Sequence, residues 1–134
     1  MAHGAYPTWK GKAWEWMLTG PPTGLSLRLA FCDDNFAYNA AHQTLGNIAG
    51  VLYSDFEVEN LGYTATGKLT GDTVVATGLL ANDVFSALVL YWKWTGGTQL
   101  FQWATESAAE PLPVELIDTQ LQVRFSLTEG IYQL

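Results

Sequence analysis

The segment Leu121–Leu127 (LQVRFSL) alternates apolar and polar residues without a break. Successive side chains of a β-strand point to opposite faces of a sheet, so this alternation predicts a strand with one buried face. The segment Gly130–Leu134 (GIYQL) follows it and is predicted to form a last short strand. A strand at this point would hold the C-terminal residues to the sheet. We therefore expect a β-sheet protein whose C-terminal residues are structural.

Further strands are predicted upstream. Leu25–Phe31 alternates, with leucines and Phe31 on one face. Asp83–Trp94 is apolar on both faces, which is typical of a strand that is covered on both sides. Gly96-Gly97 predicts a hairpin turn that leads into a return strand over Thr98–Trp103. Two more strands are expected at Val51–Val58 and Thr73–Thr77, and the turn-rich residues 62–71 are expected to form a loop.

One short helix is predicted near the N-terminus, over residues 9–18. Trp9, Ala13, Trp16 and Met17 share one face at helical spacing, and Trp14 and Leu18 extend the apolar surface around it. The sequence Thr19–Pro22 (TGPP) should end the helix, with glycine just past it and proline beyond.

The predicted strands are separated by turns and not by crossover helices, which favours antiparallel pairing. We therefore predict a mainly β fold: a two-sheet antiparallel sandwich, jelly-roll-like, with one short N-terminal helix. Residues 1–9 are expected to form an N-terminal arm and residues 10–134 a single β-sandwich domain. The arm is expected to order on assembly, and packing onto its own sheet is an equally weighted alternative.

Composition favours a protein that contacts partners. Charged residues make up only 14% of the 134 residues, against the usual ~25%, and there are six Trp, six Tyr and six Phe. Such a surface is typical of proteins that bury aromatic area against a partner, although a compact aromatic core is the alternative. The predicted interface residues are Tyr6, Trp9, Trp14, Trp92 and Trp94.

Several classes of partner and compartment are disfavoured. The net charge of -7 and the scattered basic residues argue against nucleic-acid binding. The single cysteine, Cys32, allows no intrachain disulfide. The N-terminus lacks the pattern of a signal peptide, and no apolar stretch reaches the ~18 residues of a membrane span. We therefore expect a protein made in a cytoplasm, without a membrane partner.

Catalytic and metal chemistry is also disfavoured. Cys32, Asp33, Asp34 and His42 include the residue types of a thiol nucleophile and its base, but no glycine-rich turn presents the cysteine, and a buried thiol is the expected state. Alternation of Asp55, Glu57 and Glu59 would place three carboxylates on one face, where a solvated surface is expected over a calcium site. The two histidines do not form a zinc pattern with Cys32. We expect no catalytic residue, no metal and no cofactor.

Several segments, taken in order, resemble a family of short virion proteins of tailed bacteriophages. They are the helix and strand over residues 12–31, the block Glu57–Leu69 with its Gly-Tyr-Thr-Ala turn, the Ala87–Tyr91 strand, and the Gly-Ile-x-x-Leu close at Gly130–Leu134. Together they span about 120 residues. The Trp-rich helix and the Trp92/Trp94 pair depart from the family pattern and suggest a particular local partner.

This resemblance implies a non-enzymatic structural protein of the virion, with no catalytic residues to carry over. The expected role is decoration or cementing of the capsid, with the major capsid protein or other virion subunits as partners and a trimer as the oligomer. A tail or baseplate component is the alternative within the same class. A carbohydrate-binding module for host adsorption, using exposed Trp faces, is the alternative from another class.

Overall fold

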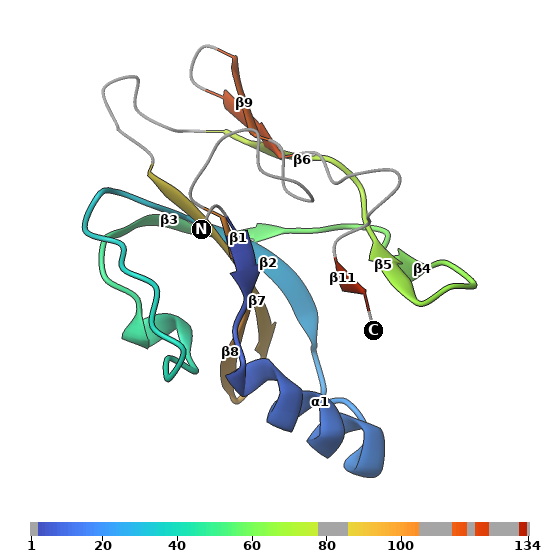
Figure 1. Cartoon of the computed structure of the whole chain (residues 1–134). Helices are drawn as coiled ribbons and strands as arrows, with labels where there is room; N and C mark the ends of the chain where they lie inside the picture. Colours follow the sequence, from blue (N-terminus) through green and yellow to red (C-terminus); the bar gives the residue numbers. More distant parts are fainter. Residues whose placement is uncertain (1–2, 78–85, 105–113, 118–119, 124–131, 134) are drawn as a thin grey trace.

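The computed structural model describes residues 3–77, 86–104, 114–117, 120–123 and 132–133. This part of the chain is mainly β, with one α-helix and a single turn of 3-10 helix (Figure 1). The elements in chain order are β1 (His3–Ala5), α1 (Thr8–Thr19), β2 (Ser26–Cys32), η1 (Leu45–Asn47), β3 (Val51–Glu57), β4 (Gly62–Tyr63), β5 (Lys68–Thr70), β6 (Val74–Ala76), β7 (Ala87–Trp94), β8 (Gly97–Ala104), β9 (Val114–Ile117), β10 (Gln120–Val123) and β11 (Tyr132–Gln133).

The main sheet has five strands in the order β1-β8-β7-β2-β3, and all of its pairings are antiparallel. The apolar strand β7 lies at the centre, between β2 and β8. Its residues from Ala87 to Trp92 are buried, so the prediction of a strand covered on both faces is confirmed for this part; residues 83–85 lie outside the described residues. The hairpin to β8 turns at Thr95 and Gly96, since Trp94 pairs with Gly97.

Two small antiparallel sheets accompany the main one, in the orders β6-β10-β9 and β11-β5-β4. The alternating segment 121–127 begins as β10, and its residues 124–127 lie outside the described part. Tyr132 pairs with Leu69, so the predicted C-terminal strand is held by β5. The prediction of a loop over residues 62–71 was wrong, because Thr64 and Lys68 close a hairpin turn that allows β4 and β5 to pair.

The alternation of β2 places its side chains in two separate cores. Leu27, Leu29 and Phe31 lie on one face, where α1 and strand β6 cover the sheet; we call this the helix face. Ala30 and Cys32 lie on the opposite face, which the irregular segment 33–50 covers; we call this the loop face. Figure 1 shows α1 at one end of the main sheet and β6 toward the other.

The N-terminal residues pack onto their own sheet, which corrects the prediction of an arm that orders on assembly. Strand β1 pairs with β8, with Gly4 opposite Trp103. The backbone N–H of Tyr6 donates to the carbonyl of Phe101 at 2.9 Å, and the Tyr6 side chain is fully buried on the loop face. The physical reason is that the large Tyr6 ring fills a place in the chain's own core, which a free arm would leave empty.

The predicted helix is confirmed as α1, one residue longer at each end. Pro7 precedes its first residue, where the missing proline N–H costs no helical hydrogen bond. Gly20 ends the helix with a φ of 87°, and its N–H donates to the carbonyl of Trp16 at 2.8 Å. A positive φ of this size favours glycine, so the stop signal read in the sequence acts as expected.

Candidate functional site

An aromatic cluster joins α1 to the helix face of the main sheet. Trp9 is at its centre, stacked on Trp92 with ring centroids 5.7 Å apart and edge-on to Phe101 at 4.9 Å. Trp16, two turns later on α1, packs edge-on to Trp92 at 6.2 Å and to Trp94 at 5.5 Å. These offset and edge-to-face geometries are the ones that aromatic pairs prefer, so the cluster fixes α1 firmly on the sheet.

The opposite side of α1 is apolar as well, but it faces solvent. Trp14 is 66% exposed, Met17 62% and Leu18 82%. These three residues, which we call the outer face, are spaced by three and four positions and therefore lie on one side of the helix. Since α1 is already held by its inner aromatic residues, the outer face stays apolar toward solvent within the described structure, and we take it as the candidate contact surface.

The structure divides the predicted interface residues into two groups. Tyr6, Trp9 and Trp92 are buried in the chain's own cores, on the loop face for Tyr6 and in the aromatic cluster for the other two. Trp14 is exposed, and Trp94 is partly exposed beside Trp16 and Lys12. The aromatic residues of the chain therefore serve its core more than the sequence suggested.

Met17 is the member of the outer face that the sequence analysis placed on the buried side of the helix. Met17 was grouped with the buried side at Trp9 and Trp16, yet it projects outward. Trp14 and Leu18 were the available signal, because at about 100° per residue they lie about 140° or more around the helix from Trp9 and Trp16.

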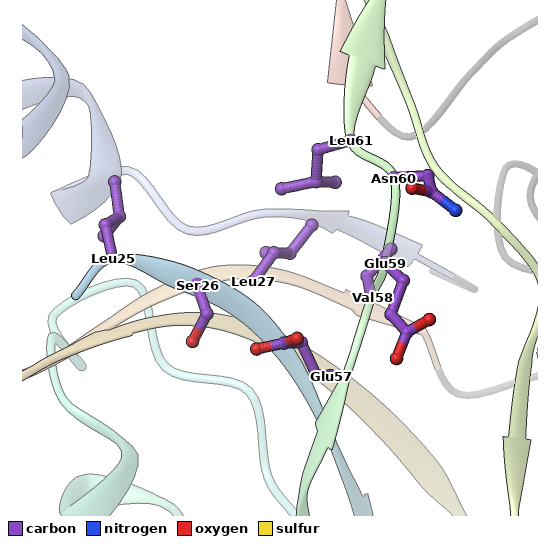
Figure 2. Close-up of a pocket in the computed structure, with 8 residues that line it drawn as sticks. All are labelled: Leu25, Ser26, Leu27, Glu57, Val58, Glu59, Asn60 and Leu61. Atoms are coloured by element: carbon purple, nitrogen blue, oxygen red, sulfur yellow. The ribbon is translucent and has the colours of Figure 1, made fainter.

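A shallow groove of about 370 Å³ lies beside the first residues of β2 (Figure 2). Apolar side chains from β2 and from the segment after β3 meet there, and Figure 2 shows Leu61 pointing toward Leu27. Glu57 lies at the polar end, where the Arg28 guanidinium approaches its carboxylate at 3.6 Å. The lining residues are Leu25, Ser26, Leu27, Glu57, Val58, Glu59, Asn60 and Leu61. The groove offers apolar contact next to carboxylates, and the Ser26 hydroxyl in its lining accepts a hydrogen bond from Arg28 Nε at 2.9 Å.

A polar network secures the edge strand β3. Asp55 has a φ of 70°, which is unusual for a residue other than glycine. Its Oδ1 accepts hydrogen bonds from Lys93 Nζ at 2.8 Å and from the Tyr91 hydroxyl at 3.0 Å, and its backbone N–H donates to that hydroxyl at 2.8 Å. The hydrogen bond from Lys93 lowers the pKa of the Asp55 carboxyl, and the one from Tyr91 lowers it further. These contacts give Asp55 a structural role.

Two of the three carboxylates that the sequence analysis considered for calcium are in ion pairs. Asp55 is paired with Lys93 and Glu57 with Arg28, while Glu59 follows the end of β3. Within the part of the chain that the structure describes, no three His, Cys, Asp or Glu side chains gather in a way that could hold a metal ion.

The Cys32 thiol is not activated. Its side chain is fully buried on the loop face, and burial, aided by the charge of Asp33, raises its pKa to about 12. Asp33 accepts a hydrogen bond from the N–H of Asn35 and so shapes the following turn. A nucleophilic cysteine needs the opposite environment, one that lowers its pKa.

No protein-family model matches this chain, and no curated protein or solved structure matches it either. Among the described helices, none has the length and apolar character needed to cross a membrane.

Proposed function

We propose that this chain is a non-enzymatic structural protein of a tailed-bacteriophage virion, which decorates or cements the capsid by bridging its subunits. The observation that carries the proposal is the outer face of α1, a rigidly supported apolar surface on a chain with few charges. The neutral, buried Cys32 thiol and the ion-paired carboxylates of β3 agree with a role in binding and not in catalysis. The class of protein, a structural protein of the virion, is inferred from the sequence resemblance to short virion proteins.

The proposed mechanism is burial of apolar area at junctions between capsid subunits. Each Å² removed from water contributes ~25 cal/mol, and the cost of association and ordering offsets much of that gain. A small net gain per copy suffices, because a capsid binds many copies in symmetric positions. The proposal includes a trimer at local three-fold positions and a second layer of strands that completes a jelly-roll-like sandwich over the main sheet.

A sugar-binding role for the Trp92/Trp94 strand is disfavoured by burial. Sugar rings stack on exposed aromatic faces, whereas Trp92 lies in the aromatic cluster between Trp9 and Trp16. We therefore keep the virion proposal as the leading one.

The test is to find the protein in purified virions and to compare particles with and without it. We expect density at local three-fold positions of the outer capsid surface, and particles that lack the protein should release their genome at a lower temperature. Density confined to the tail would replace this proposal with a tail or baseplate role. Absence from purified particles would overturn the virion assignment.

A further inference from the structure

Contacts within a single chain do not explain why α1 has a glycine at position 11. Glycine within a helix costs roughly 1 kcal/mol of stability relative to alanine. A Cβ added at Gly11 meets nothing within 4 Å, and the residue has an ordinary helical backbone, so neither packing nor backbone conformation within the chain requires glycine. Glycine on an exposed helix surface does, however, let another helix or a large side chain approach closely.

Gly11 borders the outer face. At about 100° per residue, Gly11, Trp14 and Leu18 fall within about 60° of one another on the helix. Their spacing of three and four residues is that of the seam of a helix pair. The large Trp14 side chain and the gap at Gly11 are therefore a projection and a hollow on the same surface, which makes that surface complementary to a copy of itself.

The charges beside this seam specify an orientation. Relative to Trp14, Lys10 lies about 40° to one side and Glu15 about 100° to the other. When parallel helices are related by a rotation axis along their length, two-fold or three-fold, the Lys10 edge of one copy adjoins the Glu15 edge of the next. An antiparallel pair would instead bring like edges together. Charges that flank a helix seam select pairing and orientation in this way, and the Lys12 ion pair occupies only Oε2 of Glu15.

We propose that the outer face binds the outer face of a second copy of this chain, with the two α1 helices parallel. Trp14 of each copy packs over Gly11 of the other, Leu18 extends the contact, and Lys10 pairs with Glu15 of the neighbour. The apolar residues are too few to supply the ~800 Å² per partner of a stable complex. The contact is therefore weak between two copies and becomes strong where many copies are held together. The proposal concerns the chain itself and stands apart from its location in a virion.

The first experiment measures self-association of the full chain by sedimentation velocity over a wide concentration range. We expect reversible association, weakened at least about tenfold by Trp14→Ser, as for a central aromatic contact. Tyr63→Ser is the matched control, since it removes an even more exposed aromatic ring, on β4, and should change nothing. Gly11→Ala is the sharpest variant: it should raise the melting temperature through helix propensity while weakening association severalfold.

The second experiment tests orientation. Lys10→Glu and Glu15→Lys should each weaken association, and the double exchange Lys10→Glu/Glu15→Lys should restore it, whereas Lys68→Glu on β5 serves as the charge-matched control. Leu18→Cys should form a disulfide between two copies on oxidation, because only parallel helices place this residue opposite itself. A chain that stays monomeric to ~1 mM, the range of the weakest specific complexes, would overturn the proposal. Self-association that Trp14→Ser leaves unchanged would overturn it as well, because the contact would then lie on another surface.

Discussion

At the scale of single residues, the loop face buries hydroxyl and thiol groups that titrate at high pH. Burial raises the pKa of Cys32 from 9.0 to about 12 and that of Tyr91 from 10.0 to about 12, and it raises the pKa of Tyr6 as well. Each group is therefore neutral in the folded chain at physiological pH. In the unfolded chain the same groups would ionise at their ordinary values.

This difference predicts a loss of stability in alkali. Above pH 9.0 the unfolded chain releases the Cys32 proton, which the folded chain holds until about pH 12, so the free energy of unfolding falls with rising pH over that interval. Above pH 10.0 the tyrosines steepen the fall. We expect Cys32→Ala to start lower in stability but to show a flatter profile between pH 9.0 and 10.0. Thermal melts followed by circular dichroism measure how the stability of the wild type and of Cys32→Ala depends on pH. Parallel pH profiles of the two proteins would contradict a contribution of the Cys32 thiol to the alkaline loss of stability.

At the scale of elements, α1 has two apolar sides, one that packs on the sheet and one that faces solvent. Trp9 and Trp16 hold it to the sheet, whereas Trp14, Met17 and Leu18 leave it apolar toward solvent. Composition alone counts these residues alike, because a helix with apolar residues on more than one side carries no sign of which side is inward. The distinction comes from β7 and β8, whose Trp92 and Phe101 contact Trp9 and so select the inner side.

Two tryptophans on this one helix should therefore differ sharply in their contribution to stability. Trp9→Ala removes the centre of the aromatic cluster and should cost roughly 3–5 kcal/mol of unfolding free energy. Trp14→Ala removes an exposed side chain and should change it by no more than about 0.5 kcal/mol. Guanidinium denaturation of the two variants beside the wild type measures this difference. Equal losses would mean that the outer face is part of the core.

At the scale of the whole molecule, the N-terminal segment contacts two distant parts of the fold, the main sheet and the segment that covers its loop face. Strand β1 forms one edge of the main sheet, and Tyr6 fills the loop face next to Tyr38, with ring centroids 5.3 Å apart. The Thr8 hydroxyl then donates to the carbonyl of His42 at 2.8 Å, which links the start of α1 to the segment that covers the loop face.

Deletion of residues 2–8 should consequently destabilise the protein. The deletion removes the pairing with β8 and leaves a cavity where Tyr6 was, so we expect a large fall in melting temperature. His3→Ala is a mild control, since its backbone pairing with Ala104 persists. An unchanged melting temperature after the deletion would restore the idea of a free docking arm.

Local patterns predicted much of this fold. The helix, its glycine stop, the two-faced strand β7 and the alternation of β2 all depend on residues close in sequence, and each is present. The place of Tyr6 depends on pairing with β8, which is distant in sequence, and periodicity does not reveal such a partner. Strands β4 and β5 are local partners, but they are only two and three residues long, too short to show an alternating pattern. Of the outer face, the sequence analysis predicted only Trp14 as an interface residue. The exposure of Met17 and Leu18 is decided by what covers the other side of α1, and a local pattern does not show that.

The polar network at Asp55 affects how molecules of this protein associate at high concentration. Strand β3 is an edge of the main sheet, and an open edge invites strands of other molecules. The irregular pairing of β3 with β2, the left-handed backbone at Asp55 and the Lys93 ion pair make this edge a poor template. Accumulation to high concentration would thus proceed without fibrils or inclusion bodies seeded at this edge, and molecules would meet through side chains and not through shared backbone ladders.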